Sequence, residues 1–198
     1  MKRSFRFLAA SIATTLFISL TPNSLQATPI IKAGETVAFL GDSITQGGAS
    51  HPFGYVRLVE QGLETNGSKI NVIPAGISGH KSNQMLARLE KDVLTKKPQW
   101  MTLSCGVNDV WHGANGVPLE DYKKNITSIL DQCQQAGIKV IVLTATQIRL
   151  PIDNPENTKL AAYNEFLRET AKTRNLPLAD LNADMAAEQN ALAAAGKA

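Results

Sequence analysis

The chain has 198 residues, of which 43% are hydrophobic and 19% are charged, and its 20 basic and 17 acidic residues give a formal charge of +3. Lys2, Arg3 and Arg6 supply this excess, so residues 28–198 carry 17 basic side chains against 17 acidic ones. No basic run with interleaved aromatic residues follows, and the composition therefore excludes nucleic acid as an expected partner.

Residues 1–27 are typical of an export signal. A positive start is followed by an apolar run from Phe7 to Leu20, and Leu25-Gln26-Ala27 forms a suitable cleavage site. Because the run is short for a bilayer span, we expect cleavage after Ala27, with a retained anchor as the weaker alternative. Residues 28–198 are then expected to form one domain that is periplasmic or secreted, with no membrane contact beyond the signal.

Apolar runs typical of strands alternate with segments of helical periodicity from Thr36 onward. The predicted strands are Thr36–Leu40, Ile70–Pro74, Trp100–Ser104, Lys139–Ala145 and Leu176–Leu181. The predicted helices are Tyr55–Thr65, Ser82–Leu94, Leu119–Ala136, with Gly137 as a C-terminal cap, and Thr158–Thr173. This alternation indicates an α/β fold with a parallel sheet covered on both faces. Ligands bind beyond the carboxyl ends of such strands, so residues 41–48, 75–81, 105–116 and 146–157 are the expected functional segments.

The two cysteines are expected to remain separate thiols. Export would permit a disulfide, but Cys105 ends a predicted strand, whereas Cys133 lies late in the helix that runs back along the sheet. Helix rise places the two residues roughly 20 Å apart, beyond the reach of a disulfide.

Ser43 lies in the triplet Gly41-Asp42-Ser43, which follows the first predicted strand. A phosphate-binding loop is excluded, because the segment lacks the Lys-Ser or Lys-Thr pair of a Walker loop and the G-x-G-x-x-G pattern. The triplet alone supports a helix cap as well as a nucleophile. Thr45 breaks the G-x-S-x-G nucleophile elbow, and the similar segment around Ser78 fails likewise, with His80 in its last position.

Three motifs follow three successive predicted strands: GDSIT at 41–45, GISGH at 76–80 and GVNDVW at 106–111. In this order they resemble the blocks of the SGNH hydrolases, also called the GDSL esterase and lipase family. The resemblance implies a three-layer αβα sandwich around a central parallel five-stranded sheet of the flavodoxin-like type. It also implies ester hydrolysis through an acyl-serine intermediate, without a cofactor.

The resemblance assigns roles to individual residues. Ser43 would be the nucleophile, and the backbone N–H groups of Ser43 and Gly79, with the side-chain amide of Asn108, would form the oxyanion hole. Taken singly, Gly79 fits a turn that needs a positive φ, and Asn108 fits a turn or a cap. Asp42, like Asp109, is interpreted as loop scaffolding. The side chains proposed to line the pocket are those of Asp42, His80, Trp111 and His112, with packed core as the alternative for Trp111.

The sequence departs from the family at the last block, an Asp-x-x-His near the C-terminus whose histidine activates the serine. Here Asp180 is followed by Ala183 and Asp184 by Ala187, and no histidine occurs after His112. We therefore expect the domain to be truncated at its C-terminus, in an alanine-rich helix, and its activity to be impaired if it is complete. The other candidates for the base are the histidines of the preceding loops, His51, His80 and His112.

The predicted function is an exported acyl or acetyl esterase whose substrate is a small-molecule or carbohydrate ester. Lipid esters and thioesters are alternative substrates, and the alternative function is a non-catalytic carbohydrate-binding relative that has lost the histidine. No metal site is predicted, because the three histidines lack ligand spacing with one another or with cysteine. The sequence does not predict an oligomeric state.

Overall fold

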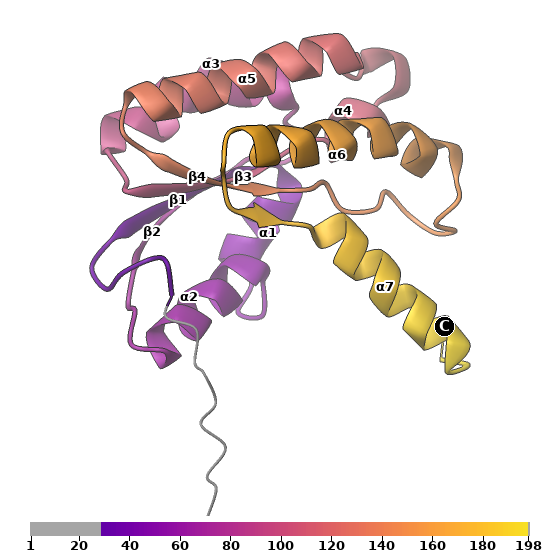
Figure 1. The fold of residues 1–198 in the computed structure, drawn as a ribbon, viewed down its shortest axis with the longest axis horizontal. Helices are drawn as coiled ribbons and strands as arrows, with labels where there is room; N and C mark the ends of the chain where they lie inside the picture. The colour runs from indigo at the N-terminus through magenta and orange to yellow at the C-terminus, as the bar shows by residue number, and fades with distance from the viewer. Residues whose placement is uncertain (1–28, 198) are drawn as a thin grey trace, which may run out of the picture.

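The computed structural model describes residues 29–197, so the predicted signal segment and its cleavage site lie outside the described residues. Five parallel strands form one sheet in the order β2-β1-β3-β4-β5, as Figure 1 shows. The strands are β1 (Thr36–Gly41), β2 (Asn71–Gly76), β3 (Trp100–Ser104), β4 (Lys139–Leu143) and β5 (Leu178–Ala179). The predicted parallel five-stranded sheet is confirmed.

Helices cover the two faces of the sheet as separate layers. In Figure 1, α3 (Ser82–Asp92), α5 (Leu119–Gln135) and α6 (Pro155–Thr173) lie above the sheet, and α1 (Ser43–Ser50) and α2 (Tyr55–Thr65) lie below it. The shorter elements are η1 (Leu94–Lys96), α4 (Val107–Trp111) and η2 (Gly113–Asn115). The last helix, α7 (Leu181–Ala194), projects away from the body and has no buried residue. The three-layer α/β sandwich is therefore confirmed.

Alternating side chains of the strands supply two apolar cores. Ala38 and Leu40 of β1 belong to the larger core, which includes residues of α3, α5 and α6. Val37 and Phe39 point to the opposite face and join the smaller core with Val56 of α2. Both faces of the central strands are buried, which is why these strands read as continuous apolar runs in the sequence.

Several predicted boundaries are confirmed, and others shift for local reasons. The bounds of β3 and α2 match the prediction, and Gly137 has φ +71° directly after the last turn of α5, as expected for a cap. The last strand is only two residues long, because Pro177 has no N–H for the ladder and Asp180 turns to cap α7. The pattern did not predict α1 and α4, which have 8 and 5 residues.

Both cysteines are free and buried, as expected. Cys105 lies just beyond β3, and Cys133 packs its sulfur 3.9 Å from that of Met101. Within residues 29–197, no helix is long and apolar enough to cross a membrane.

Candidate active site

The sheet order brings the three sequence motifs to one edge. Because β1 lies between β2 and β3, the loops that follow these strands are neighbours at the carboxyl end of the sheet. Gly41 pairs with Gly76, and Leu40 pairs with Leu103, so the three strands end nearly level. The segments containing Ser43, Gly79 and Asn108 therefore surround the beginning of α1.

Asp42, and not Ser43, caps this helix. The Oδ1 atom of Asp42 accepts from the backbone N–H of Ile44 at 2.9 Å, which leaves Ser43 as the first residue of α1 with an exposed side chain. The helix-cap interpretation of Ser43 is therefore wrong. The Ser43 hydroxyl lies at the positive end of the helix dipole, where unsatisfied N–H groups favour negative charge.

Glycine is required where β2 meets α1. A Cβ atom on Gly76 would lie 2.3 Å from the backbone nitrogen of Gln46, so the end of β2 packs directly against the helix. Gln46 also holds the next segment, since its Oε1 atom accepts from the N–H of Ser78 at 2.7 Å. Sequence reasoning missed Gln46, whose only signal was a polar side chain one turn after the triplet.

The loop carrying Gly79 has a backbone that favours glycine. Gly79 has φ +75°, a conformation that strains other residues. The loop closes with a hydrogen bond from the His80 N–H to the carbonyl of Ile77 at 3.2 Å. The turn interpretation of Gly79 is therefore correct, and it is compatible with an N–H directed at a substrate.

His80 is held as a neutral imidazole by Arg88. The Nε atom of Arg88 donates to Nδ1 of His80 at 3.1 Å. Burial first, and the charge of Arg88 second, lower the pKa of His80. Because Nδ1 accepts a hydrogen bond, the proton of neutral His80 lies on Nε2, and neither nitrogen is free to take a proton from Ser43.

Asn108 connects its own loop to the other two motif loops. Its Nδ2 atom donates to Oδ2 of Asp42 at 3.4 Å and to the carbonyl oxygen of His80 at 3.2 Å. The first of these bonds is long and therefore weak. The amide of Asn108 thus lies between the residue before Ser43 and the residue after Gly79.

Asp109 is structural. Its carboxylate is fully buried and accepts from the N–H of Ser82 at 3.0 Å, from the Ser82 hydroxyl, and from the Cys105 thiol at 3.6 Å. Burial raises the pKa of Asp109, and burial with the nearby charge of Asp109 raises that of Asp42. Burial also raises the pKa of the Cys105 thiol well above its usual range, so this thiol is unreactive.

An Asp-x-x-His spacing does occur from Asp109 to His112, but the two residues diverge on α4. The carboxylate of Asp109 is buried against Ser82, whereas His112 follows the last turn and is exposed. His51 is also exposed, and its Nδ1 atom accepts from the N–H of Phe53 at 3.1 Å.

Trp111 is not core. Its side chain is 49% exposed at the end of α4, and the guanidinium carbon of Arg149 lies 5.5 Å from the centroid of its ring. Sequence reasoning missed Arg149 and Arg88, because nothing in the local pattern indicates their distant partners. Within residues 29–197, no group of three or more His, Cys, Asp or Glu side chains is arranged to hold a metal.

A separate cavity of about 450 Å³ lies at the opposite end of the strands. Its lining includes Trp100, Lys139 and Arg174. These cations already have partners, since Lys139 lies over the Trp100 ring and Arg174 pairs with Asp131 at 2.6 Å. The cavity contains none of the motif residues.

The sequence model of the GDSL-like Lipase/Acylhydrolase family matches residues 39–197. The chain therefore belongs to this family of SGNH hydrolases, and it is a carboxylic ester hydrolase.

Relatives and solved structures agree with this assignment. The acetylxylan esterase of Geobacillus stearothermophilus is 28% identical over 172 residues, which span 77% of this chain and 78% of that protein. Thioesterase 1/protease 1/lysophospholipase L1 of Escherichia coli K12 is 29% identical over 147 residues, or 74% of this chain and 66% of that protein. The acetyl xylan esterase AlAXEase has a crystal structure with TM-score 0.70 and 34% identity, covering 75% of this chain and 78% of that one.

Crystal structures of catalytic mutants of the Geobacillus enzyme are also similar to this chain, each with TM-score 0.70. They replace a serine, a histidine and an aspartate of that enzyme with alanine.

Proposed function

We propose that this protein removes acetyl groups from hydroxyls of carbohydrates outside the cytoplasm, with Ser43 as its nucleophile. The proposal rests on the position of the Asn108 amide. It donates to Asp42, which caps α1, and to the carbonyl oxygen of His80. Two acetylxylan esterases among the similar proteins support the acetylated carbohydrate, and residues 1–27 support export.

Ester cleavage begins with attack of the Ser43 oxygen on the acetyl carbonyl carbon. Negative charge then develops on the carbonyl oxygen, and we assign its stabilisation to the N–H groups of Ser43 and Gly79 and to the Asn108 amide. Each fixed donor of this kind lowers the barrier by about 3 kcal/mol. The long bond from Asn108 to Asp42 is the contact that gives way when the amide turns to the oxyanion.

Proton transfer completes each half of the reaction. In the first half, a base takes the Ser43 proton and passes it to the departing sugar oxygen, and Ser43 becomes acetylated. In the second half, the base takes a proton from water, which attacks the acetyl-serine, and acetate is released as the proton returns to Ser43. His51 and His80 do not fit this role, because each accepts a hydrogen bond at Nδ1. The catalytic mutants of the Geobacillus enzyme support an aspartate–histidine pair as the base.

The test compares three proteins: the unchanged chain, Ser43→Ala and Ser50→Ala. Ser50 is the matched control, because it is an exposed serine at the other end of α1. With the Asp-x-x-His block added to all three proteins, a fluorophosphonate probe should label the parent and Ser50→Ala at Ser43, and Ser43→Ala should lose both the label and acetate release from acetylated xylose. Equal labelling of all three proteins would remove Ser43 from the mechanism.

A second comparison tests the base. The chain of residues 1–198 has no histidine after His112, so adding an Asp-x-x-His block from the Geobacillus enzyme should raise kcat by about a thousandfold or more. Equal, rapid turnover with and without the block would mean that a histidine already present activates Ser43.

A further inference from the structure

Large apolar side chains are exposed along the edge that holds the motifs. Ile44 follows β1, Ile77 follows β2, Trp111 follows β3 and Leu150 follows β4, and all four are exposed. Because the strand order is β2-β1-β3-β4, these four residues follow neighbouring strands at the carboxyl end of the sheet, where ligands bind in such folds. Ser43 follows β1, so an ester bound there has the loop after β2 on one side and the loops after β3 and β4 on the other.

Trp111 lies beside the proposed oxyanion donor. It follows Asn108 by three residues on α4, and side chains with this spacing share one helical face, with Cβ atoms about 5–6 Å apart. The indole therefore lies on the β3 side of the proposed oxyanion hole.

Arg149 is held over the indole by an unusual backbone. Its φ of 117° lies in a region that side chains rarely adopt, and such strain persists only where the surroundings fix it. Here two asparagines fix it: the carbonyl of Arg149 accepts from Asn154 at 2.9 Å and from Asn157 at 3.1 Å. Asn157 also accepts from the N–H of Ile148 at 2.8 Å, and Asn154 caps α6.

Unpaired acceptors lie in the same corner. Among the described residues, four buried side-chain oxygens lack a hydrogen-bond partner, and two of them are Gln147 Oε1 and Glu156 Oε2. The other oxygen of Glu156 pairs with Arg149. A hydroxyl donor would satisfy an acceptor of this kind. The segment between β4 and α6 therefore combines strain with unsatisfied polar atoms.

We propose that Trp111 and Arg149 form the subsite for the sugar ring that carries the acetyl group, an inference that rests on the proposed function. The ring stacks its C–H face on the indole, and its hydroxyls bond the Arg149 guanidinium and the Glu156 carboxylate. A sugar suits this pair because it has an apolar face and polar edges. A fatty acyl chain would instead remove both charges from water without replacing their hydrogen bonds.

A binding experiment tests the subsite without any need for turnover. The sequence has two tryptophans, and Trp100 is 5% exposed, so a ligand-induced change in indole fluorescence reports mainly on Trp111. Ser43→Ala titrated with acetylated xylotriose should show a saturable change, and Trp111→Phe, which removes the fluorophore, identifies the change as that of Trp111. Arg149→Ala should raise Kd by about fivefold or more, and Arg149→Lys should raise it less.

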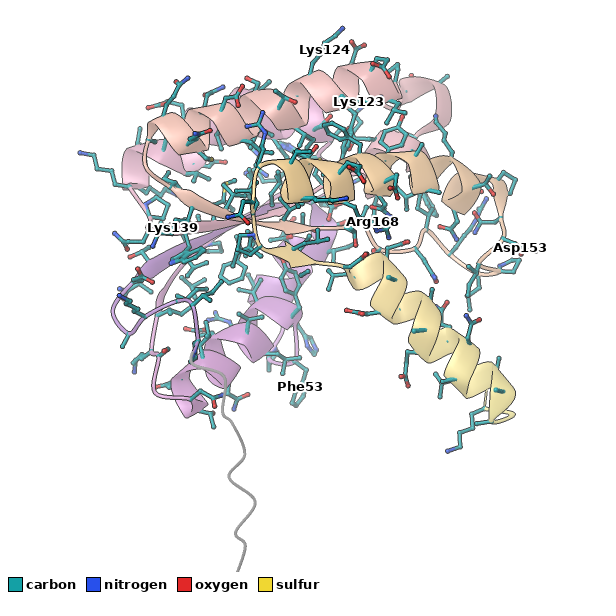
Figure 2. All side chains as sticks on the ribbon, in the orientation of Figure 1. Phe53, Lys123, Lys124, Lys139, Asp153 and Arg168 are labelled. Atoms are coloured by element: carbon teal, nitrogen blue, oxygen red, sulfur yellow. The ribbon has the colours of Figure 1, made fainter. Side chains whose placement is uncertain are left out.

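Phe53→Ala is the matched control, because Phe53 is an exposed aromatic residue of the α1–α2 connection. In Figure 2, Phe53 lies at the bottom, below the sheet, whereas Asp153, from the segment between β4 and α6, lies at the right. The Kd of Phe53→Ala for acetylated xylotriose should stay within about twofold of the parent value. No saturable change with the sugar, or an equal change with decanoic acid alone, would overturn the subsite.

Kinetics separates this inference from the proposed function. Trp111→Ala should lower kcat/KM for an acetylated xyloside about tenfold, mainly by raising KM. The kcat/KM for ethyl acetate should stay within about twofold of the parent value. Equal losses on both esters would overturn the subsite and leave the esterase intact. If the protein with the added Asp-x-x-His block released acetate from neither ester, the proposed function would fail, while the fluorescence titration would still decide the subsite.

Discussion

Arg88 donates a hydrogen bond to the carbonyl oxygen of Gly41 at 2.9 Å, which ties α3 to the last residue of β1. The same guanidinium bonds His80 at 3.1 Å and Asp92 at 2.8 Å, and its side chain is only 10% exposed. One cation therefore holds two of the segments from which the proposed oxyanion donors come. Its planar fork of donors suits three acceptors, which a lysine could not reach together.

We expect Arg88→Met to lower both stability and turnover. The substitution leaves Asp92 without its partner and should reduce the free energy of unfolding by about 1–2 kcal/mol, because the pair is partly exposed. Loss of the fixed loops should lower kcat about tenfold, with KM within about twofold. Urea unfolding and initial rates measure the two effects. Arg57→Met is the control, because Arg57 pairs with Glu60 on the exposed face of α2.

His80 should report the same contact through its pKa. Burial and the charge of Arg88 lower this pKa from 6.5, so Arg88→Met should raise it in an NMR titration of the imidazole. The lowered value also has a consequence for stability. The unfolded chain binds the proton more readily, so this residue's contribution falls as the pH drops below 6.5. An unchanged pKa in Arg88→Met would show that burial alone sets it.

Asn108→Ala tests the side-chain donor of the oxyanion hole. Removing one such donor should lower kcat about a hundredfold to a thousandfold and leave KM nearly unchanged, because the bond strengthens only in the transition state. Asn125→Ala is the control, since that amide bonds Ser82 at 3.0 Å in the Asp109 network. Equal losses in kcat for the two variants would point to general damage of the loops.

Much of the fold could be predicted from the sequence, because its strands are buried on both faces and its longer helices are amphipathic. The bounds of β3 and α2 were predicted without error. The helix α1 was missed because it has 8 residues and contains Gly47 and Gly48, which lack helical preference. Its position depends on the cap from Asp42 and on packing against β2.

The site was predictable only in part, for a similar reason. Ser43, Gly79 and Asn108 stand in short motifs behind strands, so sequence order alone brings their loops together. Arg88 and Arg149 lie outside these motifs and contact residues within them that are distant in sequence, such as Gly41, which is 47 positions from Arg88. Local patterns carry no record of such contacts, and only the packed structure reveals them.

Alanine substitutions at two glycines are expected to change stability in opposite directions. Gly76→Ala should destabilise the protein by roughly 2–4 kcal/mol, because its Cβ would lie 2.3 Å from the backbone of Gln46 and must push α1 away. Gly47→Ala should add about 0.5–1 kcal/mol, since it lies within α1 and its Cβ would meet nothing within 4 Å. Thermal unfolding measures both. A destabilised Gly47→Ala would show that α1 needs its flexibility.

Asp180 offers a test through pH. Its carboxylate accepts from Arg168 at 2.7 and 3.0 Å and from the Thr144 hydroxyl at 2.9 Å, so it joins the end of β4 to α6 and begins α7. Asp180→Asn should cost about 1–2 kcal/mol at pH 7, because these bonds are charge-assisted but partly exposed.

The pH dependence of this cost follows from the bond with Arg168, which lowers the pKa of Asp180 below 3.8. The stabilisation is complete above the unfolded-state pKa of 3.8 and is lost as the pH falls through the lower folded-state value. Urea unfolding of the parent and of Asp180→Asn should therefore differ most at pH 5–7 and converge as the pH falls through that lower folded-state value. A difference that stayed constant down to acid pH would assign the effect of Asp180 to helix capping and not to its charge.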